Sequence, residues 1–227
     1  MSSQGSILGN AVLRREDPSL LNGSEKYYDD LDVDNLHVVH FVRSPFAHAN
    51  LGEIDTSAAE AIDGVVAVYT ASNLEMEPML GFEAFPPFLA RPPLAVGKVR
   101  FVGDIVAAVI ATDKVAAADA AELVEVDYDP LPSVTSAVEA MAEGAPVLFD
   151  ELGGNVVFPT NMGDGDALEG ADHVSEVTMV SQRLAGVPME PNGCIAIPGD
   201  KNTLWASSQN PIAVRGAIAG YFGMEEE

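Results

Sequence analysis

The chain has 227 residues, of which 48% are hydrophobic, so it can bury a core and is not a disordered tail. Its 35 Asp and Glu residues outnumber 11 Lys and Arg, and the resulting net charge of −24 would repel nucleic-acid phosphates and anionic lipid. The single cysteine, Cys194, excludes an intrachain disulfide and any iron–sulfur or zinc site built from several cysteines. We therefore expect no nucleic-acid binding and no membrane insertion.

The sequence also lacks the usual signals for export. No apolar run approaches the about 20 residues that a membrane helix needs. Residues 1–10 lack the basic and apolar regions of a secretory signal. These observations predict a soluble, cytoplasmic protein.

The first half of the chain predicts strands interleaved with short helices. Runs of β-branched and aromatic residues predict core strands at 36–43, 64–70 and 105–111. Further elements are expected at 56–62 (a helix), 113–124 (a helix capped by Asp113) and 125–128 (a strand). Gly103 and Asp104 predict a hairpin turn between two strands within 99–111.

Proline-rich and glycine-rich stretches interrupt these elements. Five prolines between 75 and 93 exclude a regular helix, and we expect an ordered loop there that Phe82, Phe85 and Phe88 pin to the rest of the fold. Residues 133–160 hold one short helix and then a run rich in Gly, Pro and Asn, which predicts a linker or a covering strap. Proteolysis is expected to cut first between 133 and 165.

The second half predicts three strands and one helix. Residues 173–184 alternate well enough for a long strand, and shorter strands are expected at 194–198 and 203–208, separated by a turn. Asn210 as N-cap and Pro211 at the first position predict a helix that ends at Gly223.

Together these elements predict an α+β fold rather than a regular βαβ repeat. The predicted organisation is a tail at 1–15, an α/β domain at 16–132, a linker or strap at 133–160, and a further domain at 161–227 of which only the first strands and helix are present.

Three histidines lie close together in the sequence, but they do not predict a metal site. His37 and His40 are an odd number of residues apart in a strand, so they face opposite sides. We expect them and His48 to be partly buried or in turns.

Two other motifs predict structure rather than chemistry. Residues 163–166 (GDGD) resemble part of a calcium or phosphate loop but lack its spacing, so they predict the start of a helix at 166–172. Cys194 begins an apolar strand with no basic residue nearby, which predicts a buried, inert thiol.

Gln209 is the candidate binding residue. It follows a strand and precedes a helix N-terminus, a position at the rim of a sheet where oxygen-rich ligands bind. Its amide can donate to a bound oxygen, although a glutamine that merely hydrates a turn fits the local sequence as well.

Taken in order, six segments resemble the large, molybdopterin-binding subunit of the molybdenum hydroxylases, the family of xanthine dehydrogenase, aldehyde oxidase and aerobic carbon monoxide dehydrogenase. These segments are VLRREDPSLLNGSEKYYDDL (12–31), LHVVHFVRSPFAHANL (36–51), DGVVAVYTASNL (63–74), KVRFVGDIVAAVIATDKVAAADAAELVEVDYDPLP (98–132), GDGDALEGADHVSEVTMVSQRLAGVPMEPNGCIAI (163–197) and LWASSQNPIAVRGAIAGYFG (204–223).

The resemblance implies an N-terminal α/β hammerhead domain followed by the start of a molybdenum cofactor-binding domain. It also implies that Gln209, in the family's Ser-Ser-Gln-Asn type of motif, approaches an oxygen ligand of the molybdenum centre. The implied activity is oxidation of carbon monoxide, an aldehyde or an N-heterocycle with water as oxygen source. FAD and 2Fe–2S clusters would reside on partner subunits or domains.

Relatives in this family continue for several hundred residues, so we expect this chain to be a fragment that alone binds no cofactor, catalyses nothing and self-associates. The alternative is a non-catalytic interaction or assembly module with the hammerhead fold. Reading the coding sequence beyond Glu227 would distinguish the two, since only the enzyme requires a continuing glycine-rich cofactor loop.

Overall fold

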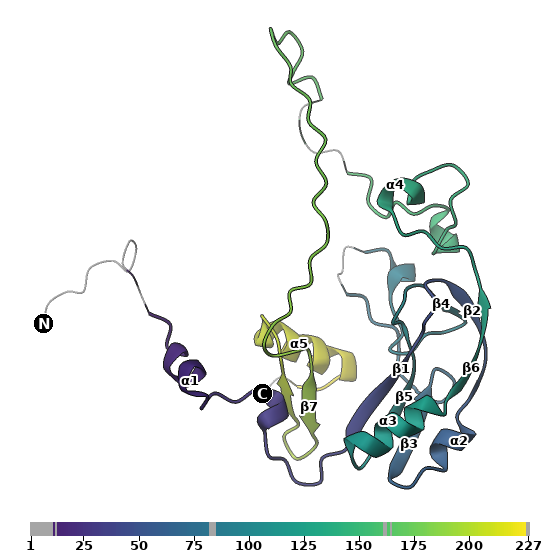
Figure 1. Ribbon diagram of the computed structural model, residues 1–227, viewed down its shortest axis with the longest axis vertical. Helices are drawn as coiled ribbons and strands as arrows, with labels where there is room; N and C mark the ends of the chain where they lie inside the picture. The colour runs from purple at the N-terminus through teal and green to yellow at the C-terminus, as the bar shows by residue number, and fades with distance from the viewer. Residues whose placement is uncertain (1–10, 12, 82–84, 161–162, 164, 226–227) are drawn as a thin grey trace, which may run out of the picture. The chain divides into compact units, whose positions relative to one another are not determined.

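A computed structural model describes residues 11, 13–81, 85–160, 163 and 165–225, and it divides the chain into two compact units (Figure 1). One unit is formed by 34–172, and the other by the described residues of 1–33 together with those of 173–227. All described strand pairs are antiparallel, so the predicted α+β class is confirmed. No helix among the described residues has the length and apolar character of a membrane span.

The first sheet contains the three predicted core strands. Its order is β1 (Val38–Arg43), β5 (Ile105–Ala111) and β3 (Val65–Thr70), which confirms the prediction. Helix α3 (Lys114–Glu122) lies against one face of this sheet (Figure 1), with α2 (Ser57–Glu60) beside it. The core between them is made of Val68 and Val109 with Ala59 and Ala120. Small alanines let the helices approach the strands closely.

The second sheet was only partly predicted. Its order is β4 (Lys98–Val99), β2 (Ala49–Asp55) and β6 (Glu125–Pro130). Strand β2 was missed because ANLGEID has few β-branched residues and no clear alternation. It lies in the middle of the sheet because it pairs with β4 on one side and β6 on the other.

The predicted hairpin at Gly103-Asp104 is wrong. Strand β4 pairs with β2 and strand β5 pairs with β1 and β3, so the chain passes from one sheet to the other at this turn. The cause is a reciprocal pair of backbone hydrogen bonds with Ser44: Gly103 N donates to Ser44 O and Ser44 N donates to Asp104 O, each at 2.8 Å. The turn is therefore bound to Ser44 at the end of β1 and is not closed by pairing between β4 and β5.

The loop at 75–93 and the segment at 133–160 contact each other through aromatic rings. Phe85 lies 5.5 Å from Phe158 and Phe88 lies 6.3 Å from Phe149, between ring centroids. Pinning by Phe85 and Phe88 is thus confirmed, while Phe82 lies outside the described residues. Segment 133–160 contains helix α4 (Ala137–Ala140) and accepts a hydrogen bond at Leu148 O from Arg100 Nε at 2.9 Å. It packs against its unit as a strap.

The other unit contains α1 (Asp17–Asn22), the two-stranded sheet of β7 (Cys194–Ile197) and β8 (Thr203–Ala206), and α5 (Pro211–Phe222). The predicted cap of α5 is confirmed, since Asn210 Oδ1 accepts from Ala213 N at 3.1 Å and Pro211 is the first helical residue. Ile195 and Ala219 are its buried apolar residues within the described part of the chain.

Two predicted elements of this region are absent from the structure. Residues 173–184 form no strand, because no described segment pairs with their backbone and a strand needs such a neighbour. Residues 166–172 form turns rather than a helix: their hydrogen bonds run over three residues, from Glu169 N to Asp166 O and from Ala171 N to Leu168 O. Gly170, at a φ of +81°, ends the segment in the left-handed region.

This geometry shifts the expected site of first proteolysis from 133–165 to 173–187. The strap is held by ring contacts and hydrogen bonds, whereas Val180 and Leu184 are each 86% exposed in an extended backbone. Brief digestion with a protease of low specificity, followed by mass spectrometry of the fragments, should find its earliest cuts in 173–187. Earlier cleavage between 136 and 158 would contradict this expectation.

Candidate functional site

The candidate site is the connection between β8 and α5, where the sequence reads Ser207-Ser208-Gln209-Asn210. Ser207 fixes the start of this connection. Its Oγ accepts from Gly193 N at 3.0 Å and lies 3.1 Å from Pro191 O, to which it can donate. Its backbone N donates to Gly193 O at 3.1 Å. These bonds tie the junction to the loop that precedes β7.

Ser208 and Asn210 fix the end of the connection. Ser208 Oγ accepts from Asn210 N at 3.0 Å, and the Asn210 side chain caps α5. Gln209 is exposed, and its side chain makes no hydrogen bond to any part of the chain that the structure describes. Three of the four motif residues therefore position the fourth, whose amide stays available to a ligand.

The loop before β7 is also held by the N-terminal part of the same unit. Tyr28 N donates to Glu190 Oε1 at 3.1 Å. The Tyr28 ring lies against Gly193, and a Cβ at that glycine would overlap the ring. Sequence reasoning missed this contact because 28 and 193 are far apart in the chain and neither position carries a local signal.

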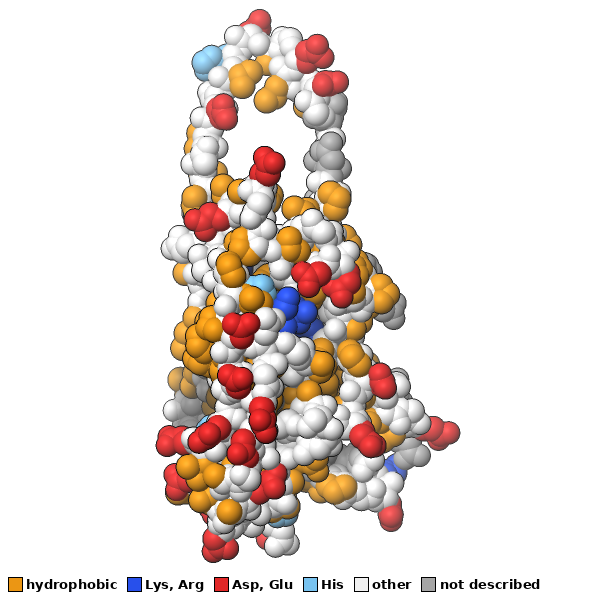
Figure 2. All heavy atoms as spheres, turned by 90° about the vertical axis from the view of Figure 1, so that its right-hand side faces the viewer, with side chains coloured by type: hydrophobic (Ala, Val, Ile, Leu, Met, Phe, Trp, Pro, Cys, Tyr) orange, Lys and Arg blue, Asp and Glu red, His pale blue; other side chains and the backbone are white. Residues whose placement is uncertain are grey.

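The N-terminus of α5 offers few further donors. Pro211 has no N–H, and the N–H of Ala213 is already bound to Asn210. An acceptor near this helix end would therefore find the Gln209 amide and the backbone N–H of Ile212 as donors. On the face drawn in Figure 2, Asp and Glu side chains are widely spread, as expected of a chain with a net charge of −24.

The histidines are not gathered into a site. His40 lies exposed on β1 and His37 just precedes that strand. His48 is buried, with its Nδ1–H donating to Pro132 O at 2.7 Å and its Nε2 without a partner in the described structure. No group of three or more His, Cys, Asp or Glu residues suited to a metal ion occurs among the described residues.

The expectation of a buried Cys194 is wrong. Cys194 is exposed, although the next residue in the strand, Ile195, is buried. Successive side chains of a strand point to opposite faces, and Cys194 shares its face with its partner Ala206, which is also exposed.

Of the GDGD motif, Asp164 lies outside the described residues, and Asp166 stands in a turn.

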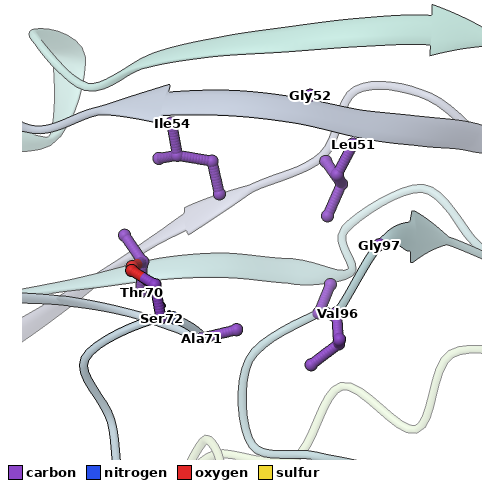
Figure 3. A pocket seen from close by; sticks show the side chains of 9 residues that line it. Leu51, Gly52, Ile54, Thr70, Ala71, Ser72, Val96 and Gly97 are labelled. Atoms are coloured by element: carbon purple, nitrogen blue, oxygen red, sulfur yellow. Dashed lines mark hydrogen bonds between the residues drawn. The ribbon is translucent and has the colours of Figure 1, made fainter.

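A separate hollow lies in the unit of 34–172 (Figure 3). Its volume is about 310 Å³, and its lining residues are Leu51, Gly52, Ile54, Thr70, Ala71, Ser72, Ala95, Val96 and Gly97. It contains no ionisable side chain.

Two groups of this unit have shifted pKa values. Hydrogen bonds from Ser57 lower the pKa of Asp55. Burial raises the pKa of Tyr128, against a smaller opposing effect of Ser44. Both groups belong to the unit of 34–172, whereas Gln209 belongs to the other unit.

The two halves of the chain match the models of two known protein-family domains. The model described as aldehyde oxidase and xanthine dehydrogenase, a/b hammerhead domain, matches residues 22–132, and the model of the molybdopterin cofactor-binding domain matches residues 148–227. Residues 22–132 thus match the hammerhead domain of the aldehyde oxidase and xanthine dehydrogenase family, and residues 148–227 match a molybdopterin cofactor-binding domain. The hammerhead match contains both three-stranded sheets, and the cofactor-binding match contains Gln209.

Individual relatives agree with this family and confirm the resemblance to molybdenum hydroxylase large subunits. The nicotine 6-hydroxylase large subunit of Paenarthrobacter nicotinovorans is 36% identical over 97% of this chain and 28% of its own length. The carbon monoxide dehydrogenase large chain of Afipia carboxidovorans is 34% identical over 94% of this chain and 29% of its own. The crystal structure of quinoline 2-oxidoreductase from Pseudomonas putida 86 superimposes with a TM-score of 0.83 and 34% identity over 98% of this chain and 30% of its own. The chain thus spans under a third of their length.

The anchoring role of Ser207 can be tested by Ser207→Ala. The substitution would leave Gly193 N without its hydroxyl acceptor, so we expect faster amide exchange at Gly193 and a loss of about 1–2 kcal/mol in the stability of this unit. Hydrogen exchange with mass spectrometry would measure the first effect and denaturant unfolding the second. Ser181→Ala, at an exposed position, is the matched control; equal effects of the two changes would contradict the role.

Proposed function

We propose that this chain forms the N-terminal portion of the molybdopterin-binding large subunit of a molybdenum-dependent hydroxylase or dehydrogenase. The substrate class is carbon monoxide, an aldehyde or an N-heterocycle, with water as the oxygen source. The observation that carries the proposal is the Gln209 junction: within the match to a cofactor-binding domain, the exposed Gln209 stands on a connection that hydrogen bonds of Ser207 and Asn210 fix on either side.

The chemistry of this junction fits an oxygen-bearing group. Within the described structure the Gln209 NH₂ group has no hydrogen-bond partner, and it stands on a connection fixed by hydrogen bonds of Ser207 N and Asn210 N, so binding would cost little rearrangement. In the proposed enzyme the molybdenum cofactor supplies the redox chemistry that transfers oxygen from water to carbon. Gln209 would hold an oxygen of that group in place by donating from its amide nitrogen.

The iron–sulfur clusters of the proposed enzyme require ligands outside these 227 residues. Iron–sulfur clusters are held by several cysteines, and the sequence has only Cys194. We place the 2Fe–2S clusters and FAD on partner subunits or domains, which fits the terms "large subunit" and "large chain" in the names of the relatives. The cytoplasm stays the predicted compartment.

Gln209→Ala, made in a large subunit with the full length of the relatives, should lower turnover about 10²–10³-fold, the usual cost of losing one positioned donor. Thermal unfolding should be unchanged because the side chain is exposed. Gln209→Glu, which keeps the shape but removes the amide donor, should be equally impaired, and the exposed Gln182→Ala should behave as wild type. Molybdenum content and turnover are measured together; normal turnover of Gln209→Ala at full molybdenum content would refute the role.

The isolated 227-residue chain should bind no stoichiometric molybdenum and should reduce no dye with carbon monoxide, aldehydes or purines. Its Gln209 junction supplies few donors, and the net charge of −24 opposes an anionic pterin, though salt screens charges beyond about 10 Å. The exposed apolar side chains of 173–189 should also cause self-association, measurable by light scattering. Elemental analysis showing one molybdenum per chain with turnover would contradict this expectation.

A further inference from the structure

The turn at 101–104, in the unit of 34–172, presents a fixed tip to solvent. Gly103 and Asp104 are bound to the backbone of Ser44, and Asp104 N also donates to Phe101 O at 3.1 Å. Ser44 itself is buried, so the turn is anchored to the interior. Val102, at the tip, nevertheless leaves 65% of its side chain exposed. A rigid, exposed apolar tip loses little entropy when it is covered by a partner.

Two arginines flank this tip, and each lies over an exposed phenylalanine. The Cζ of Arg43 is 5.6 Å from the ring centroid of Phe41, and its Nη1 donates to Gly103 O at 2.9 Å. The Cζ of Arg91 is 4.7 Å from the ring centroid of Phe101. Both rings are 42% exposed. Stacking and the bond to the turn therefore hold the guanidinium groups in place beside apolar surface.

Positive charge is concentrated around this turn. Four of the five Lys and Arg residues between 34 and 172 are Arg43, Arg91, Lys98 and Arg100. The buried Asp104 carboxylate is occupied by Arg91 Nη2 at 3.0 Å and by Arg100 N at 3.1 Å. Within the part of the chain that the structure describes, no Asp or Glu forms an ion pair with Arg43. Lys98 is paired with Asp150 at 3.5 Å and Arg91 with Asp104, so within the described structure the turn carries the unpaired charge of Arg43 on a strongly acidic chain.

Packing of the core of this unit does not explain why Phe41 and Arg43 are exposed. On β1, Val42 faces the core beneath α3, and the alternation of the strand places Phe41 and Arg43 on the opposite face. Aromatic residues and arginine are the types enriched at the centres of protein–protein interfaces. Exposed valine and phenylalanine beside them add apolar area that water solvates poorly.

We propose that Phe41, Arg43, Arg91, Phe101 and Val102 form a docking surface for another polypeptide of the enzyme complex, one that presents carboxylates around an apolar centre. Because Arg43 forms no ion pair in the described structure, it would attract a carboxylate of a partner that comes into contact with it. Salt screens the effect of the chain's more distant acidic residues on that contact. A nucleic acid needs many phosphate contacts, whereas this surface offers two arginines, one of which is paired with Asp104. Self-association of the chain is expected through 173–189 instead. This proposal rests on the proposed function only in taking the partner from the same complex.

The test uses two opposite charges at the tip. The tagged chain, in its full-length form, is co-expressed with the other subunits of its complex, and subunit retention and dissociation constants are measured at low and high salt. Val102→Glu should weaken association about tenfold or more, because it places a like charge against the partner's carboxylates. Val102→Lys should retain association within about threefold, since the lost apolar contact is offset by attraction. Val115→Glu, on the exposed side of α3, is the control with the same change elsewhere and should bind as wild type.

Thermal unfolding checks that all three variants fold. A further variant, Arg43→Gln, should weaken association and reduce the salt dependence of that association. Equal losses for Val102→Glu and Val102→Lys, or no loss for Val102→Glu, would overturn the docking surface while leaving the proposed function intact. A wild-type chain that self-associates through Val102 would overturn the choice of partner. A full-length chain that retains no other subunit would overturn both the docking surface and the multi-subunit part of the proposed function.

Discussion

The structure of the unit at 34–172 depends on the reciprocal hydrogen bonds between Ser44 and the turn at Gly103-Asp104. Strand β1 ends at this point, and the chain between β4 and β5 crosses from one sheet to the other. Ser44 and Asp104 are both buried, and an unpaired buried polar group would cost about 1–3 kcal/mol. Their mutual hydrogen bonds therefore let the chain pass between the two sheets, each of which has its own buried cluster, without leaving buried polar groups unpaired.

The same crossing has consequences at the surface. The carboxylate of Asp104 binds Arg91, and the carbonyl of Gly103 binds Arg43, so a buried structural junction fixes the positions of two exposed cations. His48 acts comparably just before the strap, where its ring Nδ1–H donates to the carbonyl of Pro132. In both cases a side chain from one segment satisfies backbone from another, which limits how far the connecting loops can move.

At the Gln209 junction, side chains also hydrogen-bond to backbone, but here one neighbouring side chain is left exposed. Ser207, Ser208 and Asn210 use their side chains on the local backbone, which leaves the connection rigid and Gln209 exposed. A free amide on a rigid connection is suited to binding, whereas the exposed apolar residues of 173–189 are suited to being covered. The two-stranded sheet of β7 and β8 is itself small for a stable unit, since isolated two-stranded sheets are marginal.

The sequence alone determined the elements whose signals are local. The strands at 36–43, 64–70 and 105–111, the Asn210 cap and the family resemblance all rest on neighbouring residues, and each is confirmed. Only the tertiary structure decided where chain segments distant in sequence meet. It placed β4 and β5 in different sheets, joined Tyr28 to Gly193, and left both 173–184 and the Cys194 thiol uncovered. Pairing and burial depend on partners that a local pattern does not specify, so alternation at 173–184 predicted a strand that pairs with no other segment among the described residues.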